Sequence, residues 1–154
     1  RSPLGAIATW AHLILQGREK LQQKYQQIYD LTQQLADYVR RSPHFSLICE
    51  PQTGIVALHT KDLDDVKAHA IYKAFEEDNE RPRFYISFAD NLRVRTMDEF
   101  RRYTSLKDAD MGHKVHGFGG LYIQIMHHAT PDLIETLIDR LDLAGYKVMR
   151  TKTR

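Results

Sequence analysis

The stretch Leu121-Tyr122-Ile123-Gln124-Ile125-Met126-His127-His128-Ala129-Thr130-Pro131-Asp132 passes from a strand pattern to a helix pattern within a few residues. Its first half is an apolar run of strand length. Thr130 is a favoured N-cap, Pro131 suits a first helical position, and Asp132 complements the positive end of a helix dipole. We therefore predict a strand over residues 121–126 and a helix over residues 131–143, in a fold that packs helices against a sheet.

Two helical patterns open the chain. Residues 3–16 are apolar nearly all round, with Pro3 at a suitable first position and Gly17 as a stop or kink. Such a helix needs partners on several sides, so we expect it to face a larger body. The second helix has an inward face spaced by threes and fours, and its glutamine-rich face is predicted to be solvated. The inward residues are Leu21, Tyr25, Ile28, Leu31, Leu35 and Tyr38.

The middle of the chain changes to strand periodicity. Residues 45–49 and 55–59 are strand-like and are joined by turn residues, which predicts a hairpin. A helix over residues 62–77 and a strand over residues 84–88 are predicted next. The inward face predicted for this helix consists of Leu63, Val66, Ala70, Ile71, Ala74 and Phe75.

The remaining segments are less regular. We expect a short helix at residues 96–100 and a glycine-rich loop at residues 113–120. Gly145 is predicted to end the last helix, and residues 146–149 are predicted to form a final edge strand. The order of elements predicts the α+β class. We expect a two-layer sandwich with a mainly antiparallel sheet of about four strands, helices on one face, and a long N-terminal helical segment before it.

Composition narrows the class of protein. The chain has 154 residues, of which 42% are hydrophobic and 27% charged, as in a soluble globular domain. No apolar run is long enough to cross a membrane. The single cysteine, Cys49, excludes an intrachain disulfide framework and favours a reducing, cytoplasmic location. Because Cys49 lies in an apolar run, we expect a buried and inert thiol.

Neither metal binding nor nucleic-acid binding is favoured by the side chains present. The histidines at positions 113, 116, 127 and 128 lie on separate predicted elements, so we predict no metal site. Arginines near Tyr85, Phe88 and Tyr103 suggest a surface that could bind phosphates and stack bases. Interspersed acids and a net charge of only +2 make nucleic acid the weakest alternative. The arginines concerned are Arg93, Arg95, Arg101 and Arg102.

A second hypothesis comes from the loop around Gly117–Gly120. This loop lacks the lysine and hydroxyl residue of a P-loop and precedes a strand, so it is predicted to be a flexible turn. Together with the amide groups that follow Thr130, it could hold an anion. The chain would then be a free-standing α+β ligand-binding or regulatory module.

Three stretches follow the motif order of a known family. They are Arg1-Ser2-Pro3-Leu4-Gly5-Ala6-Ile7-Ala8-Thr9-Trp10 with Gly17-Arg18-Glu19, then Glu50-Pro51-Gln52-Thr53-Gly54-Ile55-Val56, and finally residues 121–141. Together they resemble the C-terminal small domain of the group II pyridoxal-phosphate-dependent amino-acid decarboxylases, which are fold type I enzymes. Family members act on aromatic, acidic and diamino amino acids.

The resemblance implies that no catalytic residue lies in this chain. The lysine that binds the cofactor, the acid beside its ring nitrogen and the stacking histidine would lie in an upstream large domain. Arg1 and Ser2 would remain from a Gly-Ser/Thr-Arg motif near the cofactor phosphate, across a dimer interface. Tyr122, His127 and His128 would lie beside the substrate. Tyr122 stands where family members often have arginine, and the two histidines stand where they often have Asn-Pro.

By the same resemblance, residues 1–154 are a single domain and a fragment of a longer enzyme. Residues 1–41 would be a helical lead-in and interface segment, and residues 42–154 the α+β small domain. The leading hypothesis is that this domain helps form the active-site cleft and the homodimer of a decarboxylase that acts on an amino acid. Pyridoxal phosphate would bind to the full-length enzyme and not to this chain alone.

Overall fold

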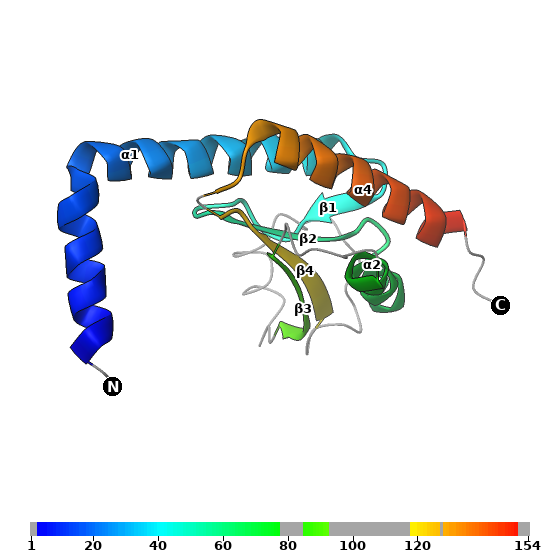
Figure 1. The fold of residues 1–154 in the computed structure, drawn as a ribbon. Coiled ribbons are helices and arrows are strands. Elements are labelled where there is room, and N and C mark those ends of the chain that lie inside the picture. Colours follow the sequence, from blue (N-terminus) through cyan, green and yellow to red (C-terminus); the bar gives the residue numbers. More distant parts are fainter. Residues whose placement is uncertain (1–2, 78–84, 93–117, 127, 151–154) are drawn as a thin grey trace.

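The computed structural model describes residues 3–77, 85–92, 118–126 and 128–150. Helix α1 covers Pro3–Arg41 and is followed by strands β1 (Phe45–Leu47) and β2 (Ile55–Thr60). Helix α2 (Asp65–Glu77), strands β3 (Tyr85–Leu92) and β4 (Phe118–Gln124), and helix α4 (Pro131–Arg150) complete the described elements (Figure 1). The predicted helix at residues 96–100 lies outside the described residues.

The strands form one antiparallel sheet in the order β1-β2-β4-β3. The predicted hairpin is confirmed, since Phe45 pairs with Thr60 and Leu47 with Leu58. Strand β4 lies between β2 and β3, although it follows both in sequence. Leu121 is paired with Leu58 on one side and with Phe88 on the other. The predicted α+β class, with its antiparallel sheet and long N-terminal helix, is therefore confirmed.

The core lies between one face of this sheet and the helices. Strand side chains alternate between the two faces, and paired residues share a face, so Leu58, Leu121 and Phe88 point to the same side. They join one apolar cluster with side chains from the second half of α1, from α2 and from α4. The fully buried members supplied by these helices are Leu35, Ala36, Val39, Ile71, Ile134, Leu137 and Leu141.

Helix α1 bends sharply at Gly17, as the sequence predicted. The backbone there has φ 69° and ψ 165°, a conformation that glycine adopts and other residues do not adopt readily. Residues 3–16, which we call the arm, turn away from the remainder of α1 and stand apart from the body (Figure 1). Large apolar side chains of the arm are exposed to solvent, as expected for a segment that faces a larger body. They are Ile7, Trp10, Leu13, Ile14 and Leu15.

The predicted C-terminal edge strand is wrong. Helix α4 continues without a break through Gly145 to Arg150. Gly145 packs closely on His44, such that a β-carbon at residue 145 would lie 3.1 Å from that of His44. Val148 packs against the core, and Lys147 and Arg150 suit the negative end of the helix dipole. Tertiary packing therefore keeps the helix going past the glycine.

The predicted inward face of α2 is partly wrong. The helix begins at Asp65, and Ile71 and Phe75 are buried as predicted. Val66, however, is 74% exposed, and Ala68 is fully buried in its place. Ala68, Ile71 and Phe75 are spaced by three and four, so they form the buried stripe of a regular helix. Val66 lies off that stripe.

Strand β4 begins earlier than predicted. Phe118 pairs with Leu92 and Gly120 with Ala89, so residues 118–120 extend the ladder. We had expected residues 113–120 to form a flexible loop, and for residues 118–120 this prediction is wrong. Sheet pairing has overridden the local preference of the glycines. Residues 113–117 lie outside the described residues.

Replacing Gly17 by alanine is expected to redirect the arm. No atom lies within 4 Å of a β-carbon built at Gly17, so the effect is confined to the backbone. Alanine in this conformation costs about 1–3 kcal/mol, and alanine is about 1 kcal/mol better than glycine inside a helix. We expect α1 to straighten. Spin labels at residues 13 and 52, in a Cys49→Ser background, should report a changed distance. Gln16→Ala is the control, and an unchanged distance in Gly17→Ala would contradict the prediction.

Replacing Gly54 by alanine is expected to lower stability. A β-carbon there would lie 2.8 Å from Cγ2 of Ile28 and 3.2 Å from the backbone oxygen of Ile125. The Ile125 N–H also donates to the Gly54 carbonyl at 2.7 Å, so the two segments cannot separate freely. The free energy of unfolding in urea should fall by about 1–3 kcal/mol. Thr53→Ala, in the same turn but exposed, should change it little. Equal effects of the two variants would refute the steric explanation.

Candidate functional site

The segment between β4 and α4 is a well-satisfied helix cap. Thr130 accepts a hydrogen bond from the Leu133 N–H at 3.3 Å, which confirms the predicted N-cap. The Gln27 side chain donates to the Ala129 carbonyl at 3.0 Å, so this glutamine of α1 is not simply solvated as predicted. His128 is exposed, and His127 lies outside the described residues. The cap therefore serves to join a strand to a helix.

Tyr122 lies at the centre of the sheet, on the face opposite the helices. It pairs with Ala57 of β2 and with Ser87 of β3. Its side chain is half-buried, and burial raises its pKa to about 12, with a smaller contribution from the nearby Cys49. The phenol therefore stays protonated at neutral pH and can donate a hydrogen bond. A group of this kind can orient a bound carboxylate or carbonyl.

Cys49 is half-buried, slightly less than the sequence predicted. Burial raises the pKa of its thiol, and the Glu50 carboxylate adds to the shift. The thiolate is the nucleophilic form of cysteine, so a raised pKa makes the side chain less reactive. This agrees with the expectation of an inert thiol.

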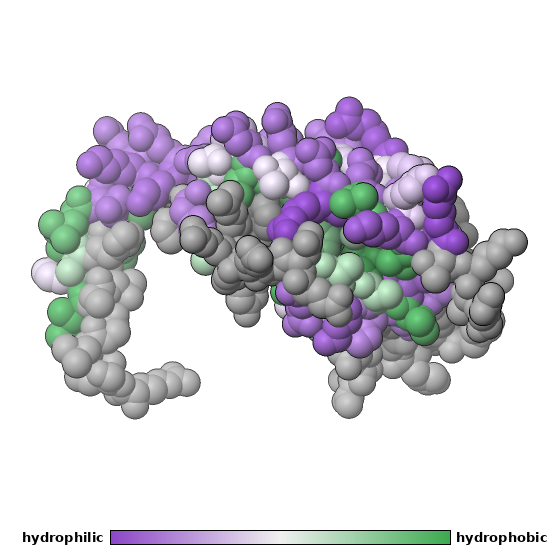
Figure 2. Space-filling model, turned by 45° about the vertical axis from the view of Figure 1, so that its right-hand side comes forward, coloured by the Kyte–Doolittle hydropathy of each residue, from purple (hydrophilic) through white to green (hydrophobic). Residues whose placement is uncertain are grey.

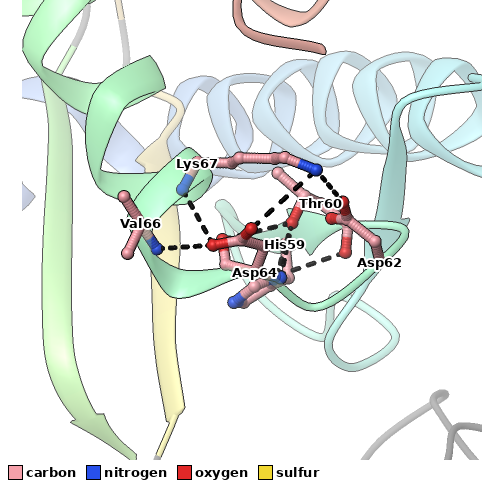
Figure 3. A network of polar contacts seen from close by, with 6 residues as sticks. All are labelled: His59, Thr60, Asp62, Asp64, Val66 and Lys67. Atoms are coloured by element: carbon pink, nitrogen blue, oxygen red, sulfur yellow. Dashed lines mark hydrogen bonds and ion pairs between the residues drawn. The ribbon is translucent and has the colours of Figure 1, made fainter. Parts of the chain in front are cut away.

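A polar cluster surrounds the turn between β2 and α2 (Figure 3). Asp64 accepts hydrogen bonds from the N–H groups of Val66 at 2.9 Å and Lys67 at 3.2 Å, and so caps α2. The Lys67 ammonium pairs with Asp62 and lies 3.8 Å from Asp64. The pKa of the Asp62 carboxyl is lowered, because hydrogen bonds from Lys67 and Thr60 outweigh the opposing effect of burial.

His59 occupies the buried side of this cluster. Its side chain is fully buried, with Nε2 3.0 Å from the Asp65 carboxylate and Nδ1 3.1 Å from the Thr60 hydroxyl. The turn also holds Leu63 at φ 54°, which is unusual for a residue other than glycine. Leu63 is buried nonetheless. The cluster therefore holds a strained turn in place, and its charged groups are engaged with one another.

A groove lies where α1 crosses the ends of β2 and β4. It has a volume of about 610 Å³, and its described lining contains no charged side chain. Tyr25 and Tyr29 line it from α1, and Ile55 lines it from β2. These three side chains are 70%, 50% and 42% exposed. Tyr25 was predicted to point inward, and this is wrong, because at residue 25 α1 has not yet reached the apolar core.

Sequence reasoning missed this groove entirely. The periodicity of α1 shows which residues share a face, but it does not show how far the body extends beneath the helix. The cluster of uncharged residues at positions 22, 25, 26 and 29, next to Gln52 and Thr53 in space, becomes visible only once the hairpin turn is placed against α1.

The other predicted positions are not tested by the geometry. Arg1 and Ser2 lie outside the described residues, as do the arginines at positions 93, 95, 101 and 102 and the histidines at positions 113 and 116. Among the described residues, no three His, Cys, Asp or Glu side chains are grouped so that they could hold a metal ion. Within the same residues, no helix has the length and apolar character to span a membrane.

The raised pKa of Tyr122 can be checked by titration. The difference in tyrosinate absorbance between the protein and its Tyr122→Phe variant should have its midpoint near 12, above the ordinary 10.0. Because the folded pKa is raised, Tyr122 stabilises the fold below pH 10, and this contribution is lost as the pH rises toward 12. Cys49→Ser should lower the midpoint, since it removes a neighbouring negative charge. A midpoint near 10 in the difference curve would show that Tyr122 is solvated.

Comparison with known proteins finds a likeness among solved structures. No protein-family model matches the sequence, and no curated protein does. Among solved structures, the chain resembles the glutamate decarboxylase domain of diaminobutyrate-pyruvate transaminase and L-2,4-diaminobutyrate decarboxylase from Vibrio parahaemolyticus. The TM-score is 0.60 at 14% sequence identity, and the match covers 90% of this chain and 25% of that chain. Nearly the whole of this chain therefore has the fold of one quarter of a glutamate decarboxylase domain.

Proposed function

We propose that this chain is the C-terminal small domain of a group II pyridoxal-phosphate-dependent amino-acid decarboxylase. One observation carries the proposal: a sequence whose motifs follow that family's order has, over 90% of its length, the fold of part of a decarboxylase domain. The order of the motifs and the fold agree, although the sequence identity to the solved chain is only 14%.

The proposal assigns the chemical step to an upstream large domain. Pyridoxal phosphate, when bound there, supplies an electron sink for the carbanion left by decarboxylation. This chain would contribute one wall of the cleft and part of the homodimer. The neutral phenol of Tyr122 would donate a hydrogen bond toward an amino-acid substrate, and His127 and His128 would lie beside it.

A phosphate is held by cationic and hydrogen-bonding donors. The guanidinium of Arg1 and the hydroxyl of Ser2 have suitable chemistry, and we propose them as contacts of the cofactor phosphate. The lysine that binds the cofactor would lie in the upstream large domain. We therefore expect this chain alone to bind no pyridoxal phosphate.

The exposed arm supports a docking role. Covering a Leu, Ile or Trp side chain of this kind stabilises a contact by about 1.5–3 kcal/mol, and the arm exposes several such side chains in a row. A large domain in the same polypeptide would cover them. The chain spans only a quarter of the solved chain that it matches, which leaves room for such a domain.

The alternative of a free-standing anion-binding module has lost part of its basis. Phe118–Gly120 belong to strand β4, so the proposed anion loop is not present in these residues. At the second part of that site, the Thr130 hydroxyl already accepts from the Leu133 N–H. The decarboxylase domain is therefore the better supported proposal.

The test uses the longer polypeptide that contains this chain. After dialysis it should retain pyridoxal phosphate, and it should release carbon dioxide from at least one aromatic, acidic or diamino amino acid. Arg1→Ala should weaken cofactor binding about 10- to 100-fold, since a hydrogen bond to a charged group contributes about 1.5–3 kcal/mol. Arg18→Ala, which changes an exposed arginine of helix α1, is the control. A polypeptide that retains no cofactor and releases no carbon dioxide would refute the proposal.

A further inference from the structure

Helix α4 has a row of exposed residues on the side that faces away from the core. Leu143 is 52% exposed and Tyr146 is 46% exposed, although both are large and mainly apolar. Asp139 and Arg150 are exposed as well. The four residues are spaced by four, three and four, so they lie in one line along the helix. We call Asp139, Leu143, Tyr146 and Arg150 the outer row.

The outer row has a charge at each end and apolar groups at its centre. Among the residues that the structure describes, neither Asp139 nor Arg150 forms an ion pair. Eleven residues of helix place their α-carbons about 16 Å apart, too far for them to pair with each other. The Arg150 guanidinium stacks on the Tyr146 ring at 4.3 Å. Stacking occupies the face of the guanidinium, so the N–H groups along its edge can still bind a carboxylate.

The outer row is complementary to a second copy of itself. When two α4 helices lie side by side in opposite directions, Arg150 of each copy lies beside Asp139 of the other. Leu143 of each copy then packs against Tyr146 of the other. One two-fold axis forms each contact twice, as in the isologous interfaces of most homodimers. The net charge of only +2 gives little general repulsion between two copies.

Other kinds of partner fit the outer row less well. Figure 2 shows the upper side of the body, which α1 and α4 form, as mainly hydrophilic with single apolar side chains. An apolar partner would bury the charges of Asp139 and Arg150 without a counter-charge, which is costly. A nucleic acid would be repelled by Asp139 and by the exposed carboxylates of Asp132 and Glu135 on the same helix.

We propose that two copies of this chain associate through their outer rows, with the α4 helices antiparallel. Helix α4 packs on one face of the sheet, and Tyr122 lies on the other face, so the contact leaves the Tyr122 face free. The inference therefore does not depend on the proposed function, and in a homodimeric enzyme it would join one dimer to the next. Contacts smaller than about 1,200 Å² are typically transient. We expect a reversible dimer that becomes more populated as the concentration rises.

Two charge reversals test the pairing of the outer rows. Arg150→Glu and Asp139→Arg each place like charges opposite one another at both ends of the helix pair. Sedimentation over a range of concentrations should show that each variant alone self-associates about tenfold more weakly than the unmodified chain, because two charge pairs are lost. An equimolar mixture of the two variants should associate as strongly as the unmodified chain, because every charge then lies beside an opposite one. A mixture that associates no better than the separate variants would overturn the inference, as would an unmodified chain that stays monomeric.

Two further variants separate this contact from general effects of charge and stability. Arg18→Glu changes the net charge as much as Arg150→Glu does, at an exposed position of α1, and should leave self-association unchanged. Equal weakening by these two variants would overturn the inference. Leu143→Gln removes the exposed apolar centre without adding a charge, so unfolding in urea should change little while self-association weakens. Unchanged self-association of Leu143→Gln would also overturn the inference, even if a charge reversal unfolded α4.

Discussion

The fold depends on the pairing of β4 with β2. Residues 61–117 separate these strands in the sequence, and β3, which precedes β4, joins on its far side. Leu58 and Leu121 face each other across this ladder and are both fully buried. Until they meet, α2 and the second half of α1 have no continuous apolar surface to cover. Contacts so distant in sequence are costly to form in chain entropy, and the packing of both helices depends on them.

This dependence explains which features the sequence could predict. The strand cores, the hairpin and the N-cap at Thr130 rest on local patterns, and all are confirmed. The length of α4 and the start of β4 depend on residues distant in the sequence. Gly145 leaves room for the side chain of His44, and Phe118 and Gly120 pair with residues of β3. No local pattern carries that information. The same reasoning applies to the candidate site. The sequence indicated an unpartnered arm, but it gave no sign of the groove, which exists only where a hairpin turn meets a helix.

The turn between β2 and α2 shows how local strain is held in a small domain. Leu63 adopts a positive φ, which costs about 1–3 kcal/mol for a residue of this type, and its burial recovers about 1.5–3 kcal/mol. The Asp64 cap and the Lys67 pairs then keep the turn in that conformation. Helix α2 starts immediately afterwards, at Asp65, so the turn also fixes where that helix begins.

The bend at Gly17 separates two parts of α1 that differ in how their apolar residues are distributed around the helix. Beyond residue 30 the helix buries Leu31, Leu35 and Val39. Their spacing by four residues gives the helix one apolar face, as is typical of a surface helix. Before residue 17 the helix is apolar nearly all round, so packing on one side would leave its other apolar side chains exposed. A continuous straight helix would carry that apolar segment away from the body along one line. The glycine instead turns it back beside the groove, at a conformation that other residues adopt only with strain. In this chain alone the large apolar side chains of the arm stay exposed to water, which costs free energy unless another surface covers them.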